Sequence, residues 1–185
     1  MSITLITGGV RSGKSSYAEA RIKANGYDAL YIATAIAGDD EMRERVAAHR
    51  AARPATWPTW ETHRDLHTVA SVVDPTAYRA ILLDCVSNLL TFVWFDEISA
   101  EDGFSAAEVD AVERICCAEL DAIAAFAREY DKDLLLVTNE VGWGIVPPSA
   151  LGRAYRDTLG RLNQHCAQLA DEVILLVSGI PLRIK

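Results

Sequence analysis

A glycine-rich segment close to Met1 is the first whose residue types could do chemistry. Its residues are Gly8, Gly9, Val10, Arg11, Ser12, Gly13, Lys14 and Ser15, which match the phosphate-loop pattern G-x-x-x-x-G-K-S/T in full. Glycines let successive backbone N–H groups turn toward one anion, and a following helix adds its positive N-terminus. Lys14 would reach the β- and γ-phosphates, and the Ser15 hydroxyl would ligate Mg²⁺. A chance match in a turn is the alternative, but a strand before and a helix after favour nucleotide binding.

A carboxylate at the end of a buried strand is the second expected part of a triphosphate site. Asp84 closes the apolar run Ala80–Cys85 and is the best candidate to hold Mg²⁺ or its waters. The alternative is an ordinary strand-end aspartate that caps the next helix. A phosphate loop needs such a carboxylate somewhere, which favours the metal-binding interpretation.

A histidine and an arginine share one stripe of a predicted helix over Asp39–Arg53. His49 and Arg53 stand four residues apart, so both could address one anionic group, and Pro54 bars continuation of the helix. A lone histidine on a partly apolar stripe is more often a packed, hydrogen-bonded side chain. Spacing alone therefore favours a structural role for His49.

Two further segments carry aromatic or polar groups in weaker patterns. Trp57 and Trp60 could stack on a flat ligand but are more often core residues, and Glu61 alone indicates a surface carboxylate. The segment Thr138–Pro147 follows a buried strand, where open α/β sheets carry ligand loops. Two arginines beyond it could reach a phosphate or be ordinary surface residues: Arg153 and Arg156.

Apolar strand-like runs alternate with helical patterns and would position these groups. The predicted strands are Ile3–Thr7, Ala29–Thr34, Ala80–Cys85, Leu134–Asn139 and Val173–Ser178. The predicted helices are Gly13–Ala24, Asp39–Arg53, Ser105–Tyr130 and Ser149–Ala170. Continuous apolar runs are expected for strands buried on both faces of a parallel sheet. The alternation predicts a three-layer α/β fold with a mostly parallel central sheet, and the 185 residues suit one domain, 1–185.

The acidity of the chain is confined to one segment. The 26 acidic and 18 basic residues give a net charge of −8, while Asp96–Asp133 holds 12 acidic and 3 basic residues. A net-acidic chain is a poor candidate for nucleic acid, where phosphate contacts dominate the affinity. We interpret the acidic segment as a solvated helix face or a subunit edge, which leaves the near-neutral remainder for an anionic ligand.

Compartment signals favour the cytoplasm. Residues Met1–Thr7 carry no secretory signal, and the longest apolar stretch, Ala80–Phe95, is too short and too polar to span a membrane. The four cysteines form no CxxC pair and no metal-ligand pattern, so zinc and redox chemistry are not expected. We expect buried, reduced thiols, which fit the cytosol.

Taken together, these motifs resemble one family, the bifunctional adenosylcobinamide kinase/adenosylcobinamide-phosphate guanylyltransferases of cobalamin synthesis. The resemblance covers nearly the whole chain: TGGVRSGKS (Thr7–Ser15), YIAT (Tyr31–Thr34), DDEM and HRAARP within Asp39–Pro54, ILLDC (Ile81–Cys85), TNEVGWGIVP (Thr138–Pro147) and VSGIPLRIK at residues 177–185. The phosphate loop is common to countless families, whereas H-x-x-x-R-P and N-E-V-G-x-G-I-V-P are far more specific. Asp84 stands where some relatives have glutamate, and either carboxylate can serve Mg²⁺.

The resemblance implies a P-loop nucleoside triphosphate hydrolase-like fold, a homo-oligomer (a trimer) and two reactions. ATP or GTP phosphorylates the hydroxyl on the aminopropanol arm of adenosylcobinamide. GMP from GTP then joins adenosylcobinamide phosphate, which gives adenosylcobinamide-GDP and pyrophosphate. His49 matches the histidine that carries GMP as an intermediate, so the resemblance favours a catalytic role for His49 over a structural one. Lys14 is the other implied catalytic residue. The implied nucleotide contacts are Gly8, Gly9, Val10, Arg11, Ser12, Gly13, Lys14, Ser15, Thr34, Ala35, Ile36, Arg50, Ala51, Ala52, Arg53, Glu61 and Asp84, with Mg²⁺ on Ser15 and Asp84.

Two other functions fit the phosphate loop alone. A plain P-loop small-molecule kinase would leave His49 in a structural role. A nucleotide-dependent binding switch would turn over slowly. Because the chain has one phosphate-loop motif, we expect both family reactions to share it, with His49 required only for nucleotidyl transfer.

Overall fold

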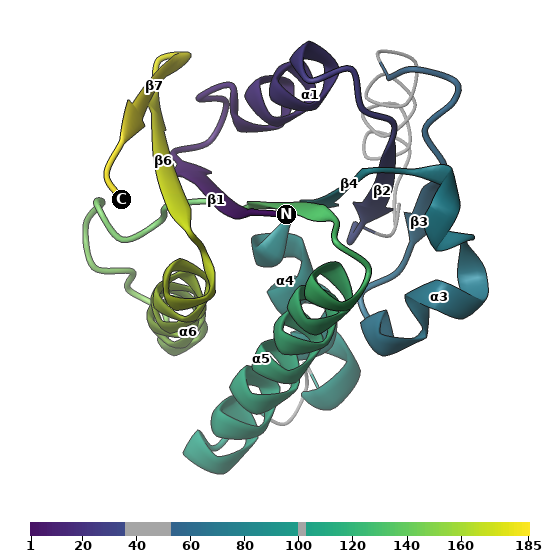
Figure 1. Ribbon diagram of the computed structural model, residues 1–185. Coiled ribbons are helices and arrows are strands. Elements are labelled where there is room, and N and C mark those ends of the chain that lie inside the picture. The colour runs from purple at the N-terminus through teal and green to yellow at the C-terminus, as the bar shows by residue number, and fades with distance from the viewer. Residues whose placement is uncertain (36–52, 100–102) are drawn as a thin grey trace.

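A seven-stranded sheet organises the residues that the computed structural model describes, 1–35, 53–99 and 103–185 (Figure 1). The sheet order is β3-β2-β4-β5-β1-β6-β7. Its strands are β1 (Ile3–Gly8), β2 (Ala29–Ala33), β3 (Thr59–Glu61), β4 (Ala80–Asp84), β5 (Asp133–Val137), β6 (Glu172–Val177) and β7 (Ile180–Arg183). Neighbouring strands are parallel except β6 and β7, which are antiparallel. The mostly parallel sheet confirms the α/β fold class predicted from the alternating pattern.

Helices cover both faces of this sheet and make the three layers. Helix α1 (Lys14–Ala24) lies on one face, and α4 (Val86–Glu97), α5 (Ala106–Glu129) and α6 (Ala150–Leu169) lie on the other (Figure 1). Successive strand residues point to opposite faces. In β2, Leu30 and Ile32 therefore pack into the core under α4, α5 and α6, while Tyr31 packs into the core under α1. Burial on both faces explains why the strands are continuously apolar.

The predicted elements that fall in the described ranges begin and end within two residues of the observed ones. Local capping sets two of these ends. Ser105 Oγ accepts from Glu108 N, and the Glu108 carboxylate accepts from Ser105 N, which makes a capping box at the start of α5. Ser149 caps α6 through a single hydrogen bond, in which its Oγ accepts from Gly152 N. The predicted helix over Asp39–Arg53 lies, apart from Arg53, outside the described residues.

Several short or apolar elements were not predicted. Helix α4 follows β4 within the single apolar run Ala80–Phe95, where hydrophobic periodicity cannot separate a strand from a buried helix. Strands β3 and β7 are too short to leave a pattern. The same holds for α3 (Val69–Val72) and two 3₁₀ turns (Leu66–Thr68 and Pro75–Ala77). No helix in the described part of the chain is long and apolar enough to cross a membrane.

All four cysteines are free thiols, as predicted. Cys85, Cys116 and Cys166 are buried and Cys117 is half-buried. Burial raises the pKa of Cys85 to about 11 and the pKa values of Cys116 and Cys166 to about 12. Because the thiolate is the reactive form, these three thiols are chemically inert near neutral pH.

Candidate nucleotide site

The phosphate loop connects β1 to α1 at the carboxyl edge of the parallel strands. Gly8 has φ 148° and Gly13 has φ 94°, conformations that favour glycine. A Cβ on Gly8 would also overlap the backbone oxygen of Leu176 in neighbouring β6. Gly179 N, in the β6–β7 turn, donates to Ser12 O (2.9 Å). The loop is therefore braced by the end of β6, and Gly8 cannot gain a side chain without moving a strand.

Lys14, the predicted catalytic lysine, begins α1 and is buried. Its Nζ donates to Gly9 O (2.6 Å) and to Ser12 Oγ (3.4 Å), so the ammonium lies over the loop. Burial holds the pKa of Lys14 below its ordinary value, although the nearby Cys85 and Asp84 act in the opposite direction. A partly desolvated ammonium held over the phosphate loop is well placed to attract a phosphate.

A cavity of about 560 Å³ opens beside this loop. Nine of the predicted nucleotide-binding residues line it: Val10, Arg11, Ser12, Gly13, Lys14, Ser15, Ala35, Arg53 and Asp84. Seven residues outside that predicted set complete the lining, of which Asn139 belongs to the segment Thr138–Pro147 that was expected to carry a ligand loop: Ser16, Tyr31, Ala33, Cys85, Asn88, Val137 and Asn139. The volume is mid-range for a small-molecule site, and residues from five separate chain segments converge on it.

Asp84 ends β4 inside the cavity, where two side chains fix its surroundings. Tyr31 OH donates to Asp84 Oδ2 (2.7 Å), and the Arg53 guanidinium lies 3.6 Å from the centroid of the Tyr31 ring. Burial and the adjacent Asp84 raise the pKa of Tyr31, so the phenol keeps its proton and stays a donor. The N-cap residue of α4 is Cys85, which disfavours the helix-capping alternative for Asp84.

The two residues predicted to hold Mg²⁺ fit that ion chemically. Ser15 and Asp84 both line the cavity, and a hydroxyl and a carboxylate are oxygen donors of the kind Mg²⁺ prefers. No group of three or more His, Cys, Asp or Glu in the described ranges could hold a metal alone. Mg²⁺ commonly binds through one or two protein oxygens together with waters and substrate phosphates. The pair therefore suits a divalent ion that binds with a nucleotide.

Thr34 and Glu61 do not line the cavity. Thr34 is buried, and its Oγ1 donates to Cys85 O (2.7 Å) and accepts from Cys85 N (2.8 Å). That pair of bonds ties the end of β2 to the start of α4. Glu61 ends the edge strand β3, exposed and in register with Ala33 of the cavity wall. Gly8 and Gly9 belong to the phosphate loop but are likewise not among the lining residues.

The remaining candidate residues either lie outside the described residues or do not line the cavity. Five of them lie outside the described residues: Ile36, His49, Arg50, Ala51 and Ala52. Trp57 is buried in the core under α1, which agrees with its interpretation as a core residue and not as a stacking surface. Arg153 Nη1 donates to Pro147 O (3.0 Å), and Arg156 pairs with Asp157 (3.5 Å). Arg153 thus fixes the loop after β5 instead of lining the cavity.

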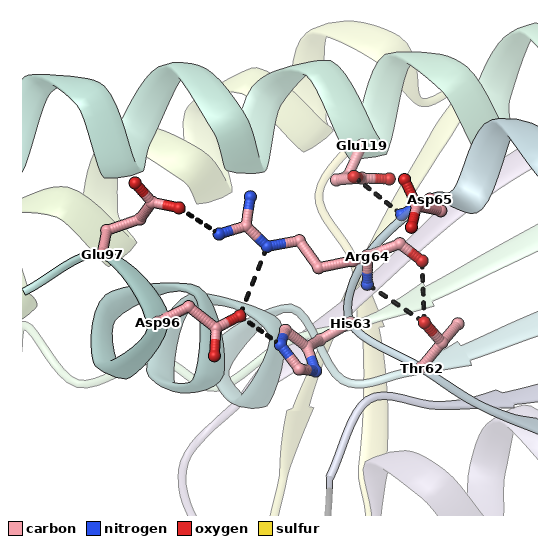
Figure 2. Close-up of polar contacts among 7 residues, drawn as sticks. All are labelled: Thr62, His63, Arg64, Asp65, Asp96, Glu97 and Glu119. Carbon is pink, nitrogen blue, oxygen red and sulfur yellow. Dashed lines mark hydrogen bonds and ion pairs between the residues drawn. The ribbon is translucent and has the colours of Figure 1, made fainter.

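A charged network that sequence reasoning missed fixes the chain just after β3 (Figure 2). Arg64 donates to Asp96 (3.4 Å) and Glu97 (2.5 Å) at the end of α4, and His63 Nε2 lies 2.6 Å from Asp96 Oδ2. Glu119 on α5 accepts from two backbone N–H groups of the turn that follows. Part of the acidic segment is therefore paired within the protein and holds the β3 edge against α4 and α5.

The fold and the cavity define a P-loop nucleotide-binding protein. Among solved structures, the KaiC-like protein PH0186 of Pyrococcus horikoshii OT3 matches with a TM-score of 0.51 and 14% identity, over 94% of this chain and 70% of that chain. A likeness at that identity shows the fold alone.

The chain belongs to the family described as cobinamide kinase / cobinamide phosphate guanyltransferase, which matches residues 4–184. It is 43% identical over 181 residues to the bifunctional adenosylcobalamin biosynthesis protein CobU of Salmonella typhimurium, and 42% identical to CobU of Escherichia coli K12. Each alignment covers 98% of both chains. CobP of Pseudomonas aeruginosa is 38% identical over 98% of this chain and 96% of that protein. The family inferred from short motifs is thus confirmed along almost the whole chain.

Proposed function

We propose that this chain performs two reactions at the phosphate-loop cavity. The first is phosphorylation of adenosylcobinamide by ATP or GTP, and the second is transfer of GMP from GTP to adenosylcobinamide phosphate. One observation carries the proposal: Lys14, Ser15 and Asp84 meet in one cavity beside the loop. These are the groups that phosphoryl transfer requires. Relatives that are 38–43% identical are named bifunctional adenosylcobalamin biosynthesis proteins, which supports the pair of activities.

In the kinase step, the protein positions the reactants and offsets charge. The loop amides and Lys14 hold the phosphates, and Arg53 adds a second cation in the cavity wall. The acceptor hydroxyl attacks the γ-phosphorus and loses its proton, while the bond from that phosphorus to the β-phosphate oxygen breaks. Ser15 and Asp84 would hold Mg²⁺, which neutralises phosphate charge when bound.

In the nucleotidyl step, His49 accepts GMP. A neutral imidazole nitrogen attacks the α-phosphorus of GTP, and the bond to the pyrophosphate oxygen breaks. The phosphate of adenosylcobinamide phosphate then attacks the same phosphorus, and the P–N bond breaks to restore the imidazole. Support comes from the H-x-x-x-R-P match and from Ala35 and Arg53, which flank the segment holding His49 and both line the cavity.

Radiolabelled GTP tests this route. The protein incubated with α-labelled GTP should acquire an acid-labile, base-stable label, and His49→Ala should lose both the label and the transferase while it still phosphorylates adenosylcobinamide. The matched variant His67→Ala replaces an exposed histidine and should keep both activities. Label retained by the His49→Ala protein would overturn the role of His49. Phosphorylation without any adduct in the unaltered protein would favour a plain kinase.

The proposal extends to assembly and location. Residues 1–185 form one catalytic domain that acts in the cytoplasm as a homo-oligomer, a trimer. The edge strand β7 supports self-association, because Ile180, Leu182 and the adjoining Ile184 are exposed. An apolar edge strand is a site where another chain can pair. Light scattering should give three chain masses, and a monomer mass would contradict the assembly.

A further inference from the structure

An exposed apolar loop follows β5, in the segment Thr138–Pro147. Trp143 is 76% exposed, Ile145 is 95% exposed and Val146 is 60% exposed. Three large apolar side chains that are exposed within four consecutive residues indicate a segment that binds a partner or ligand. Neither proposed reaction step has used these side chains so far.

Hydrogen bonds hold this loop at both ends. At its start, Glu140 N donates to Gly8 O (3.0 Å), and Gly142 N donates to Glu140 Oε1 (2.8 Å). At its end, Arg153 Nη1 donates to Pro147 O (3.0 Å). The loop is therefore fixed to the phosphate loop and to α6, and it presents its apolar side chains outward from a defined position. Binding loops on rigid scaffolds have this character.

The same loop continues directly from the wall of the nucleotide cavity. Val137 and Asn139 line the cavity, and Trp143 follows four residues after Asn139. Asn139 Nδ2 donates to Ser87 Oγ on α4 (2.6 Å), so this part of the wall is itself fixed. Four residues of chain span at most about 14 Å, so Trp143 lies within that distance of the cavity wall, a span that the side arm of a large ligand can bridge.

Adenosylcobinamide, the proposed phosphoryl acceptor, is too large to share the cavity with a nucleotide. About 560 Å³ is the space of one small ligand, since sites for drug-sized molecules span roughly 300–1,000 Å³. A corrinoid has a broad macrocycle with apolar faces, and its acceptor hydroxyl stands on a flexible side arm. The macrocycle must therefore lie outside the cavity while the arm enters it.

We propose that Trp143, Ile145 and Val146 form the surface that binds the corrin ring of the acceptor. The inference rests on the proposed function and adds the place of the substrate. The indole supplies a flat aromatic face for contact with the ring, and the two aliphatic side chains extend that contact. A second copy of this chain is the other occupant to exclude. The direct connection of the loop to the cavity favours the corrinoid.

Steady-state kinetics of the kinase reaction test the proposal on the intact protein. The KM for adenosylcobinamide should rise about tenfold or more in Trp143→Ala and about threefold in Ile145→Ala, since a buried aromatic anchor dominates such contacts. The KM for ATP should stay within about twofold, because a uniform loss of corrinoid binding leaves the nucleotide site intact. Equilibrium dialysis, read by corrinoid absorbance, measures the same loss without turnover.

Two exposed apolar residues elsewhere provide matched controls. Phe95→Ala on α4 and Val72→Ala on α3 remove similar side chains and should leave both KM values unchanged. A corrinoid KM and Kd within twofold of the unaltered protein in Trp143→Ala would overturn the proposal. A smaller oligomer mass for that variant would overturn it too, because the loop would then be a subunit contact. Failure of the unaltered protein to phosphorylate adenosylcobinamide would instead contradict the proposed function.

Discussion

Replacing Tyr31 by phenylalanine removes one hydroxyl and keeps the ring on which Arg53 lies. That hydroxyl donates to Asp84 Oδ2 at 2.7 Å from a buried position. Tyr31→Phe therefore tests whether the orientation of Asp84, and not merely its presence, matters to the site. Tyr78→Phe is a matched control, because Tyr78 is also buried and its hydroxyl has no hydrogen-bond partner among the described residues.

The loss of stability in Tyr31→Phe depends on the charge and the exposure of Asp84, which accepts the hydrogen bond. A hydrogen bond to a charged group contributes about 1.5–3 kcal/mol. Asp84 is partly exposed, so water can replace part of the lost bond, and we expect the free energy of unfolding to fall by about 1–2 kcal/mol. Loss of a bond that orients a metal-binding carboxylate typically lowers metal affinity or activity about 10–100-fold. We therefore expect half-maximal kinase activity to need at least about tenfold more Mg²⁺.

Initial rates of phosphorylation at saturating ATP and adenosylcobinamide, measured across a Mg²⁺ series, give this value, and urea unfolding gives the stability. Tyr78→Phe should match the unaltered protein in Mg²⁺ dependence and be equally or more stable. If Tyr31→Phe needs no more Mg²⁺ than Tyr78→Phe does, the idea that Tyr31 orients a metal-binding Asp84 is refuted.

Two further predictions concern the loop and the charged network. Gly8→Ala should lower the free energy of unfolding by about 2 kcal/mol or more, because the new Cβ would overlap a backbone oxygen of β6. Gly160→Ala is the control, because Gly160 lies in α6 with open space around it, and this variant should be more stable than the unaltered protein. Urea unfolding measures both changes. Burial raises the pKa of Asp96, but hydrogen bonds from His63 and Arg64 outweigh it and lower the pKa below its ordinary value. The folded-state pKa is thus below the unfolded one, so Asp96 stabilises the fold above the unfolded pKa and loses this effect as pH falls through the folded pKa. Asp96→Asn should cost under about 1 kcal/mol near pH 7, since the carboxylate is partly exposed, and the cost should vanish in urea titrations at strongly acid pH; a cost that does not change with pH would contradict this.

The phosphate loop and the strands could be predicted because their causes are local. Gly8 and Gly13 are required by backbone conformation, and continuous apolar runs reflect burial on both faces of the sheet. Helix α4 escaped prediction because it shares one apolar run with β4. The predicted family is confirmed, whereas the roles of individual site residues stay predictions.

The missed residues depend on contacts between distant segments. Tyr31 meets Asp84 only because β2 and β4 pair in one particular register. His63 and Arg64 meet Asp96 only after β3 takes its place at the sheet edge. Sequence spacing carries no record of such registers. A buried strand tyrosine beside a strand-end aspartate is the signal that could have indicated the first of these contacts.

Because the thiols of Cys85, Cys116 and Cys166 are buried and protonated, thiol reagents should modify them only slowly. A single cysteine introduced at an exposed position would therefore be modified far faster than these three. Half-buried Cys117, whose pKa burial also raises, is the one native thiol to replace beforehand. Fluorophores or spin labels can then be attached at chosen points around the cavity, and the movements of the protein during its reactions can be followed in solution.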